Sequence, residues 1–140
     1  SYKWAAIEAR LRQFRPDEGS PFDGVVLAYT NPFTGGPVLP TLACHVQLLR
    51  PGERTRAHRH TASAVYHVVR GRGATIVNGE RHAWEHGDTL ALPTWAWHEH
   101  ENASVSDDAI LFSVSDQPVL QALGLSREQP YDAPDGHQPG

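Results

Sequence analysis

The N-terminal segment of the chain alternates apolar and polar residues with a helical period. Trp4, Ile7, Leu11 and Phe14 recur at spacings of three and four residues, which places them on one face of a helix. Residues 15–21 contain two prolines and a glycine, residue types that end helices and form loops. The pattern therefore predicts a short amphipathic helix at the start of the chain, followed by a loop.

The central part of the chain has a different pattern, in which short apolar runs are separated by turn residues. The runs that predict strands span residues 25–29, 42–49, 64–69, 74–77, 89–92 and 109–114. Asn78 and Gly79 follow the fourth run, and both tolerate the positive φ angles of a two-residue hairpin turn. Many short strands with frequent turn signals are typical of an all-β barrel or sandwich.

The end of the chain carries one further helix signal and then becomes polar. Asp116 is a common N-cap residue, Pro118 falls in the first turn, and Gly124 is a typical helix stop. Residues 126–140 are polar and rich in proline and glycine, which indicates an extended or poorly ordered tail. We therefore expect a single domain over residues 1–125 and a polar tail over residues 126–140.

Charge and composition exclude several classes of protein. The chain has 12 Lys and Arg against 16 Asp and Glu, so it lacks the basic surface that a nucleic-acid partner requires. No apolar run approaches the ~20 residues needed to cross a bilayer, so we expect no membrane partner. The single cysteine, Cys44, excludes an internal disulfide and favours a reducing, cytoplasmic location.

Histidine is the residue type whose number stands out. The chain has 9 histidines in 140 residues, and histidine is the commonest metal ligand. In an extended segment His58 and His60 point to the same face, where two imidazoles can contact one cation. His98 follows a strand and a proline-containing turn and can bring a third imidazole from a distant part of the chain. The pair alone fits two ordinary structural histidines equally well, but the three together point to a metal site.

The spacing around these histidines resembles the two motifs of the cupin superfamily. The matching residues are Gly52, His58, His60 and Gly71 in the first motif, and Gly87, Pro93, His98 and Asn102 in the second. Ala64 stands where the first motif has a glutamate, and Trp95 stands where the second has a glycine. The resemblance implies an all-β, single cupin barrel (a double-stranded β-helix, or jelly roll) with a short helix at each end. It also implies a metal held by three neutral imidazoles, those of His58, His60 and His98.

Over nearly its whole length the chain is similar to the C-terminal cupin of the gentisate 1,2-dioxygenase group, which includes salicylate and 1-hydroxy-2-naphthoate dioxygenases. The similarity is clearest in residues 31–41, 49–52, 58–61 and 93–100. Proteins of this group are longer and contain two cupins, and an active cupin uses Fe(II) to cleave a hydroxylated aromatic acid with O2. The resemblance thus implies Fe(II), with Zn(II), Ni(II), Cu(II) or Mn(II) as alternatives, because all of these accept imidazole ligands.

The same resemblance assigns residues around the metal. His100 matches a pocket histidine that assists the substrate hydroxyl, and Gln47 matches a pocket glutamine. The arginine that holds the substrate carboxylate falls at Tyr66, and a pocket tryptophan falls at Ala43. A tyrosine gives one neutral hydrogen bond where arginine gives a charge-assisted pair, which argues against gentisate itself as the substrate. The expected catalytic residues are His100 as acid/base, with Gln47 and Tyr66 orienting a small-molecule substrate.

These features predict a metal-dependent cupin, a non-haem Fe(II) dioxygenase that acts on a small hydroxylated aromatic or related carboxylic compound. Two alternatives stay open: a non-catalytic metal- or ligand-binding cupin, such as the structural half of a two-cupin protein, and a cupin isomerase or epimerase. We also expect a homodimer, because the apolar stripe of the N-terminal helix must be covered. His45 and His67 are expected to have structural or interface roles.

Overall fold

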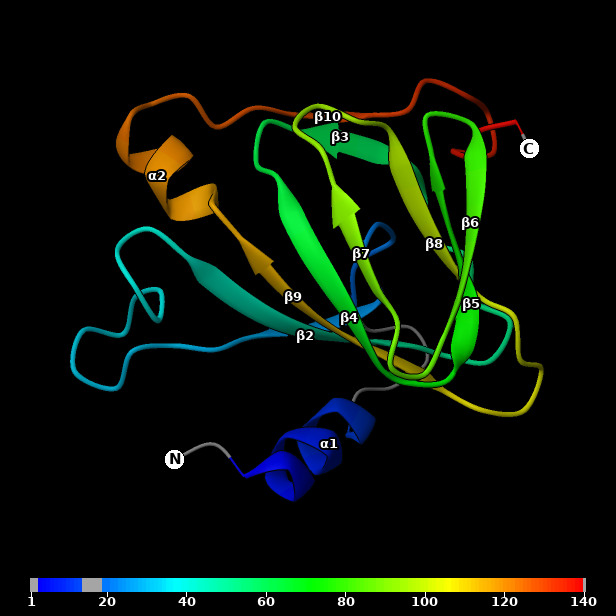
Figure 1. Cartoon of the computed structure of the whole chain (residues 1–140), viewed down its shortest axis with the longest axis horizontal. Helices are drawn as coiled ribbons and strands as arrows, with labels where there is room; N and C mark the ends of the chain where they lie inside the picture. Colours follow the sequence, from blue (N-terminus) through cyan, green and yellow to red (C-terminus); the bar gives the residue numbers. More distant parts are fainter. Residues whose placement is uncertain (1–2, 14–18, 140) are drawn as a thin grey trace.

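The computed structural model describes residues 3–13 and 19–139 and shows two antiparallel sheets that face each other (Figure 1). The first five-stranded sheet has, in spatial order, β1 (Val25–Ala28), β2 (Ala43–Leu49), β9 (Ala109–Ser115), β4 (Ala64–Arg70) and β7 (Thr89–Leu92). The second has β10 (Glu128–Pro130), β3 (His58–His60), β8 (His98–Asn102), β5 (Arg72–Val77) and β6 (Glu80–Glu85). The helices are α1 (Trp4–Arg12) and α2 (Gln117–Ala122). The predicted all-β barrel with a short helix near each end is confirmed.

Strand β2 shows how the period-two pattern divides the barrel into an inside and an outside. Val46 and Leu48 point outward and pack with Leu11 of α1, whereas Leu49 belongs to the core between the sheets. Helix α1 thus lies against the outer face of the first sheet (Figure 1). Of the predicted stripe, Leu11 is buried and Trp4 and Ile7 are partly buried against this sheet. Phe14 lies outside the described residues. In the described residues, no helix is long and apolar enough to cross a membrane.

All six strands predicted from apolar runs are present, with ends within two residues of the prediction. The sequence pattern missed β6 and β8 because neither has an apolar face: β6 is largely exposed, and β8 reads His-Glu-His-Glu-Asn. The hairpin at Asn78 and Gly79 is confirmed, because both residues have positive φ angles, 49° and 81°.

The expected capping role of Asp116 needs correction. Asp116 is the N-cap residue of α2, but its side chain makes no capping hydrogen bond. Its carboxylate instead accepts hydrogen bonds from the backbone N–H (2.8 Å) and hydroxyl (3.2 Å) of Ser63. The side chain therefore fixes the loop between β3 and β4 rather than the helix.

The segment after α2 is extended, and it packs along the second sheet as strand β10, antiparallel to β3. Further along, the buried Gln138 donates from its side chain to the carbonyl of Ile76 (3.0 Å) and accepts from the N–H of Gly79 (2.8 Å). The C-terminal segment therefore reaches past β3 and β8 to the hairpin between β5 and β6. It also brings side chains beside the histidines of β3.

Candidate metal centre

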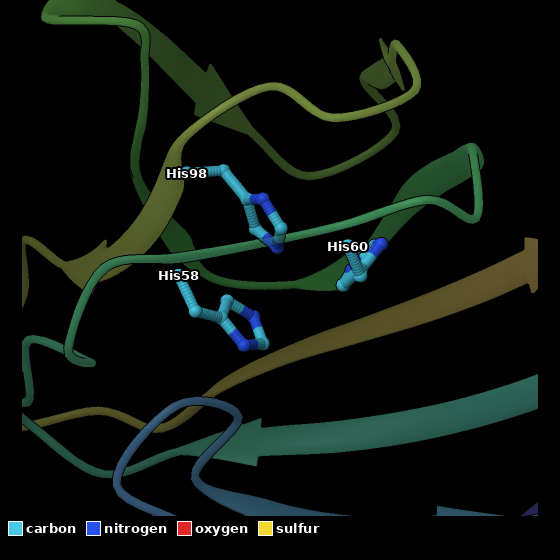
Figure 2. Close-up of side chains that lie close together, drawn as sticks. All are labelled: His58, His60 and His98. Carbon is cyan, nitrogen blue, oxygen red and sulfur yellow. The ribbon is translucent and has the colours of Figure 1, made fainter. Parts of the chain in front are cut away.

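The three predicted ligand histidines converge between the two sheets. Strands β3 and β8 are paired neighbours in the second sheet, and His58 lies directly opposite His98 in their register. His60 is two residues along β3, on the same face as His58. Figure 2 shows the three rings pointing into a shared space, and their ligand nitrogens lie within 4.8 Å of one another. In the described ranges, no other group of three or more His, Cys, Asp or Glu side chains is placed to hold one ion.

Hydrogen bonds fix the tautomer of each imidazole. Nδ1 of His58 lies 2.8 Å from Oε1 of Glu128, and those of His60 and His98 lie 2.8 and 3.0 Å from the carbonyls of Ala62 and Ala96. Because these oxygens only accept, each Nδ1 carries the hydrogen and each Nε2 keeps its lone pair. Nε2 of both His58 and His98 is buried and has no hydrogen-bond partner among the described residues. Such orphaned acceptors fit a bound cation.

The protonation of the histidines also suits metal binding. Burial, together with repulsion from neighbouring imidazoles, lowers the pKa of His98 to about 3 and that of His58 to about 4. Both rings are therefore neutral at pH 7, the form that binds a metal. Phe22 stacks on the His58 ring with 4.9 Å between centroids and 13° between planes, which restricts its rotation.

A cavity of about 280 Å³ lies beside His58 and His60. One end of the barrel interior is apolar and filled by residues such as Leu49, Val68 and Leu111. The cavity is at the other end, where the inward side chains of the first sheet turn polar; those that line it include His45, Gln47, Tyr66, Ser113 and Ser115. Its size is close to the lower end of the about 300–1,000 Å³ typical of small-molecule sites.

Two of the three predicted catalytic residues line this cavity. Gln47 is buried in its wall, and its side-chain amide donates to the backbone carbonyl of Asp23 (3.3 Å). Tyr66 is also buried in the wall, and burial raises the pKa of its hydroxyl. His100 does not line the cavity: it is fully buried, with its ring 4.9 Å from that of Tyr66 and its Nδ1 2.9 Å from the hydroxyl of Thr75.

Several residues at the site were missed by the sequence analysis. Asp23 and Glu128 are among the residues that line the cavity, although neither belongs to a recognisable motif. His45 also lines it, while His67 faces outward and contacts the hydroxyl of Thr89 (3.1 Å). His45 could have been found, because it is two residues before Gln47 on β2 and shares its face.

Glu128 is expected to strengthen metal binding although it is not a ligand. Its carboxylate orients the His58 ring and raises the basicity of Nε2, and loss of such a partner typically weakens metal affinity by about 10–100-fold. We expect this loss in Glu128→Ala and a smaller one in Glu128→Gln, which keeps an acceptor oxygen. Competition with a chromophoric chelator measures it, and Glu80→Ala, an exposed glutamate on β6, is the control. Unchanged affinity in Glu128→Ala would contradict this role.

Arg59 holds the ligand-bearing strands together from the opposite face of β3. Its guanidinium carbon lies 4.3 Å from the ring centroids of both Trp95 and Trp97, and its Nε and Nη2 donate to Oε1 of Gln129 (2.9 and 2.6 Å). Trp95 has a φ of 62°, in the region that favours the glycine of the motif. The Arg59 stack therefore supports an unfavourable backbone conformation in the loop that leads to His98.

Replacing Arg59 by methionine is expected to destabilise the protein by about 1–2 kcal/mol, because the change removes two cation–π contacts. Thermal unfolding measures this as a lower Tm. Arg72→Met, on the exposed end of β5, is the matched control and should leave Tm unchanged. The Tm of Arg59→Lys should lie between those of Arg59→Met and Arg72→Met, because lysine keeps the positive charge but loses the planar stacking on the tryptophans. Equal Tm values for Arg59→Met and Arg72→Met would refute the role of the stack.

The fold is a jelly-roll barrel in which three inward-pointing imidazoles form a candidate metal centre between the two sheets. In a comparison with protein families, the family described as Cupin domain matches residues 45–115. The chain therefore belongs to the cupin family.

The relatives of the chain are aromatic dioxygenases. It is 52% identical to 5-aminosalicylate 1,2-dioxygenase of Comamonas sp, over 98% of this chain and 37% of that protein. It is 40% identical to the 1-hydroxy-2-naphthoate 1,2-dioxygenase of Nocardioides sp. (strain KP7), over 92% of this chain and 33% of that protein. A crystal structure of salicylate 1,2-dioxygenase from Pseudoaminobacter salicylatoxidans with gentisate superposes with a TM-score of 0.82 at 31% identity, covering 91% of this chain and 36% of that one. The chain thus spans about a third of the length of these relatives, and the predicted resemblance is confirmed.

Proposed function

We propose that this cupin binds Fe(II) through His58, His60 and His98 and acts in the oxidative ring cleavage of a small hydroxylated aromatic compound. The observation that carries the proposal is the convergence of three imidazoles, two of them with buried, unpartnered Nε2 atoms, beside a polar cavity. The names of the relatives, which are ring-cleaving dioxygenases of salicylates, gentisate and hydroxynaphthoate, support it.

When bound, an Fe(II) with three imidazole ligands supplies open coordination positions for a substrate oxygen and O2 and the redox chemistry that joins them. The protein supplies the arrangement around it. Glu128 and the carbonyls of Ala62 and Ala96 hold the Nδ1 hydrogens, so that each Nε2 faces the centre. The apolar end of the barrel closes the interior behind the site, which keeps water from that side.

Gln47 and Tyr66 orient the substrate in this proposal, because both side chains line the cavity. His100 serves as the acid/base group. Burial lowers the pKa of its imidazole well below 6.5, so it is neutral at pH 7 and acts first as a proton acceptor. Its ring lies behind that of Tyr66, with 4.9 Å between the centroids, and is not part of the cavity wall.

Oxygen consumption tests the proposal directly. The protein is loaded with Fe(II) without oxygen, and O2 uptake is then measured with dihydroxybenzoates, catechols and salicylates. We expect uptake with at least one compound and none in a His98→Ala variant. A protein that binds one metal ion but consumes no O2 with any compound would instead be a non-catalytic, metal-binding cupin.

The homodimer, the cytoplasmic location and the identity of the metal stay predictions. The argument for a dimer from the apolar stripe no longer holds, because α1 packs on its own sheet. Light scattering in solution measures the oligomeric state, and metal analysis of the purified protein identifies the ion among Fe(II), Zn(II), Ni(II), Cu(II) and Mn(II).

A further inference from the structure

The C-terminal segment (residues 126–139) contacts both strands that carry the metal ligands. In Figure 1 it runs from α2 past β3 and β8 to the hairpin between β5 and β6. On β3 it pairs as β10, and Glu128 orients the ring of His58. Among the described residues, β3 and β8 share one pair in their register, His58 with His98. A segment bound to both strands is therefore placed to hold one ligand strand relative to the other.

The contact between this segment and β8 is made by a buried carboxylate. Glu99 lies between two inward-pointing histidines of β8, so its side chain points to the outer face of the sheet, where it is 0% exposed. Its Oε2 accepts hydrogen bonds from Nδ1 of His137 (2.7 Å) and Nε of Arg54 (2.9 Å), and its Oε1 accepts from the N–H of Gln138 (2.7 Å). A buried carboxylate is costly unless donors satisfy its oxygens. Two of the three donors belong to the C-terminal segment, so Glu99 fixes that segment on β8.

Strand β10 lies between two anchors. On one side, the N–H of Thr61 donates to the carbonyl of Arg127 (3.0 Å), and its hydroxyl accepts from the N–H of Arg127 (2.9 Å). On the other side, the side chain of Gln138 is 5% exposed and is bonded to Ile76 (3.0 Å) and Gly79 (2.8 Å). The three residues of β10 are all exposed, and a short exposed strand opens easily unless its ends are held. The position of Glu128 thus depends on anchors outside β10.

We propose that the C-terminal segment is a positioning element for the metal centre, in which the anchor at Glu99 and Gln138 holds β3 beside β8 and keeps Glu128 on its histidine. The ligand geometry is complete when the segment is docked, so the apparent metal affinity is reduced by the fraction of molecules in which it is undocked. By thermodynamic linkage, a bound metal stabilises the docked segment by the same factor. The inference rests on the proposed function, since it requires a metal ion at the three histidines.

The metal affinity of a variant remote from the ligands tests this inference. Gln138→Ala removes both side-chain hydrogen bonds to the hairpin. We expect its affinity for Zn(II), measured by competition with a chromophoric chelator, to fall by about three- to tenfold, the range that loss of a hydrogen bond typically produces. Gln121→Ala, the same change at an exposed glutamine on α2, is the matched control and should bind Zn(II) as the wild type does. Circular dichroism checks that both variants are folded.

Hydrogen exchange in the wild-type protein gives the reciprocal test and depends on no variant. We expect Zn(II) to slow exchange of the amides of Tyr131 and Gln138, which donate to the Ala57 carbonyl and to Glu99. The Gly35 amide, bonded within the loop between β1 and β2, is the control and should exchange at the same rate with and without Zn(II).

Two outcomes would overturn the inference and leave the proposed function standing. One is equal Zn(II) affinity of the wild type and a folded Gln138→Ala variant. The other is exchange of the Tyr131 and Gln138 amides that Zn(II) does not change, which a purely structural anchor would give. A wild-type protein that binds no Zn(II) would overturn both the inference and the proposed function.

Discussion

Replacing His98 by alanine is expected to abolish stoichiometric metal binding. His98 is 1% exposed, and its Nε2 has no partner in the described part of the chain, so its lone pair is available to an ion at the centre. The variant keeps the two imidazoles of β3 but loses the ligand from β8. Loss of an outer partner of a ligand already costs about 10–100-fold in affinity, so loss of a ligand should cost at least about 100-fold.

Metal content after dialysis and chelator competition measure this effect. The control is His82→Ala, which makes the same chemical change at an exposed histidine on β6 and should retain one ion per chain. A His98→Ala protein that kept one ion at wild-type affinity would show that the three histidines do not form the centre. Circular dichroism confirms that the variant is folded, which it should be, because the pairing of β8 with β5 uses backbone groups.

The ligands could be predicted from sequence because their placement depends on short-range spacing. His58 and His60 share a face of β3 through the two-residue period of a strand. The second motif fixes the distance of His98 from the turn that precedes β8. The apolar runs were equally informative, because burial on one face imposes the alternation seen in β4.

The rest of the site depends on contacts between segments far apart in the chain, which leave no periodic signal. Glu128 reaches His58 only because β10 pairs with β3 across 70 residues of sequence. Asp23 reaches the cavity from a loop that precedes the barrel. The predicted position of His100 beside the substrate came from the matched spacing. The full burial of His100 and its hydrogen bond with Thr75 depend on the pairing of β8 with β5, in which these two residues lie opposite each other.

The departures from the cupin motifs are linked to new contacts in the structure. Trp95 replaces a glycine at a positive φ, and Arg59, stacked against it, supports the conformation. Ala64 replaces a glutamate and lines the cavity. The wall thereby lacks the carboxylate of the motif, while Asp23 brings one from a different loop. The charge of the cavity is thus set by residues outside both motifs.

Acid is expected to destabilise the metal-free protein strongly. The pKa of His98 is about 3 and that of His58 about 4 in the folded state, against 6.5 for an ordinary histidine. Below pH 6.5 the unfolded chain therefore takes up protons that the folded chain does not, so the free energy of unfolding falls as the pH falls. Each of these histidines lowers the free energy of unfolding by about 1.4 kcal/mol for every unit by which the pH falls. The decrease stops only when the pH approaches the pKa of that histidine in the folded state.

Urea unfolding in the presence of a chelator, repeated between pH 7.5 and pH 4.5, measures this slope. Near pH 7.5 both histidines are largely neutral in both states and contribute little slope. Between pH 6 and pH 4.5 the two together should remove about 3 kcal/mol per pH unit, a large share of the about 5–15 kcal/mol typical of a folded domain. His98→Gln should reduce the slope by about a third, because glutamine does not titrate and the pKa of His100 is also well below 6.5, so that His58 and His100 keep their share. His82→Gln should leave the slope unchanged. A wild-type protein whose stability stayed constant over this range would show that the two imidazoles become protonated in the folded state, and hence that they are not held as neutral ligands.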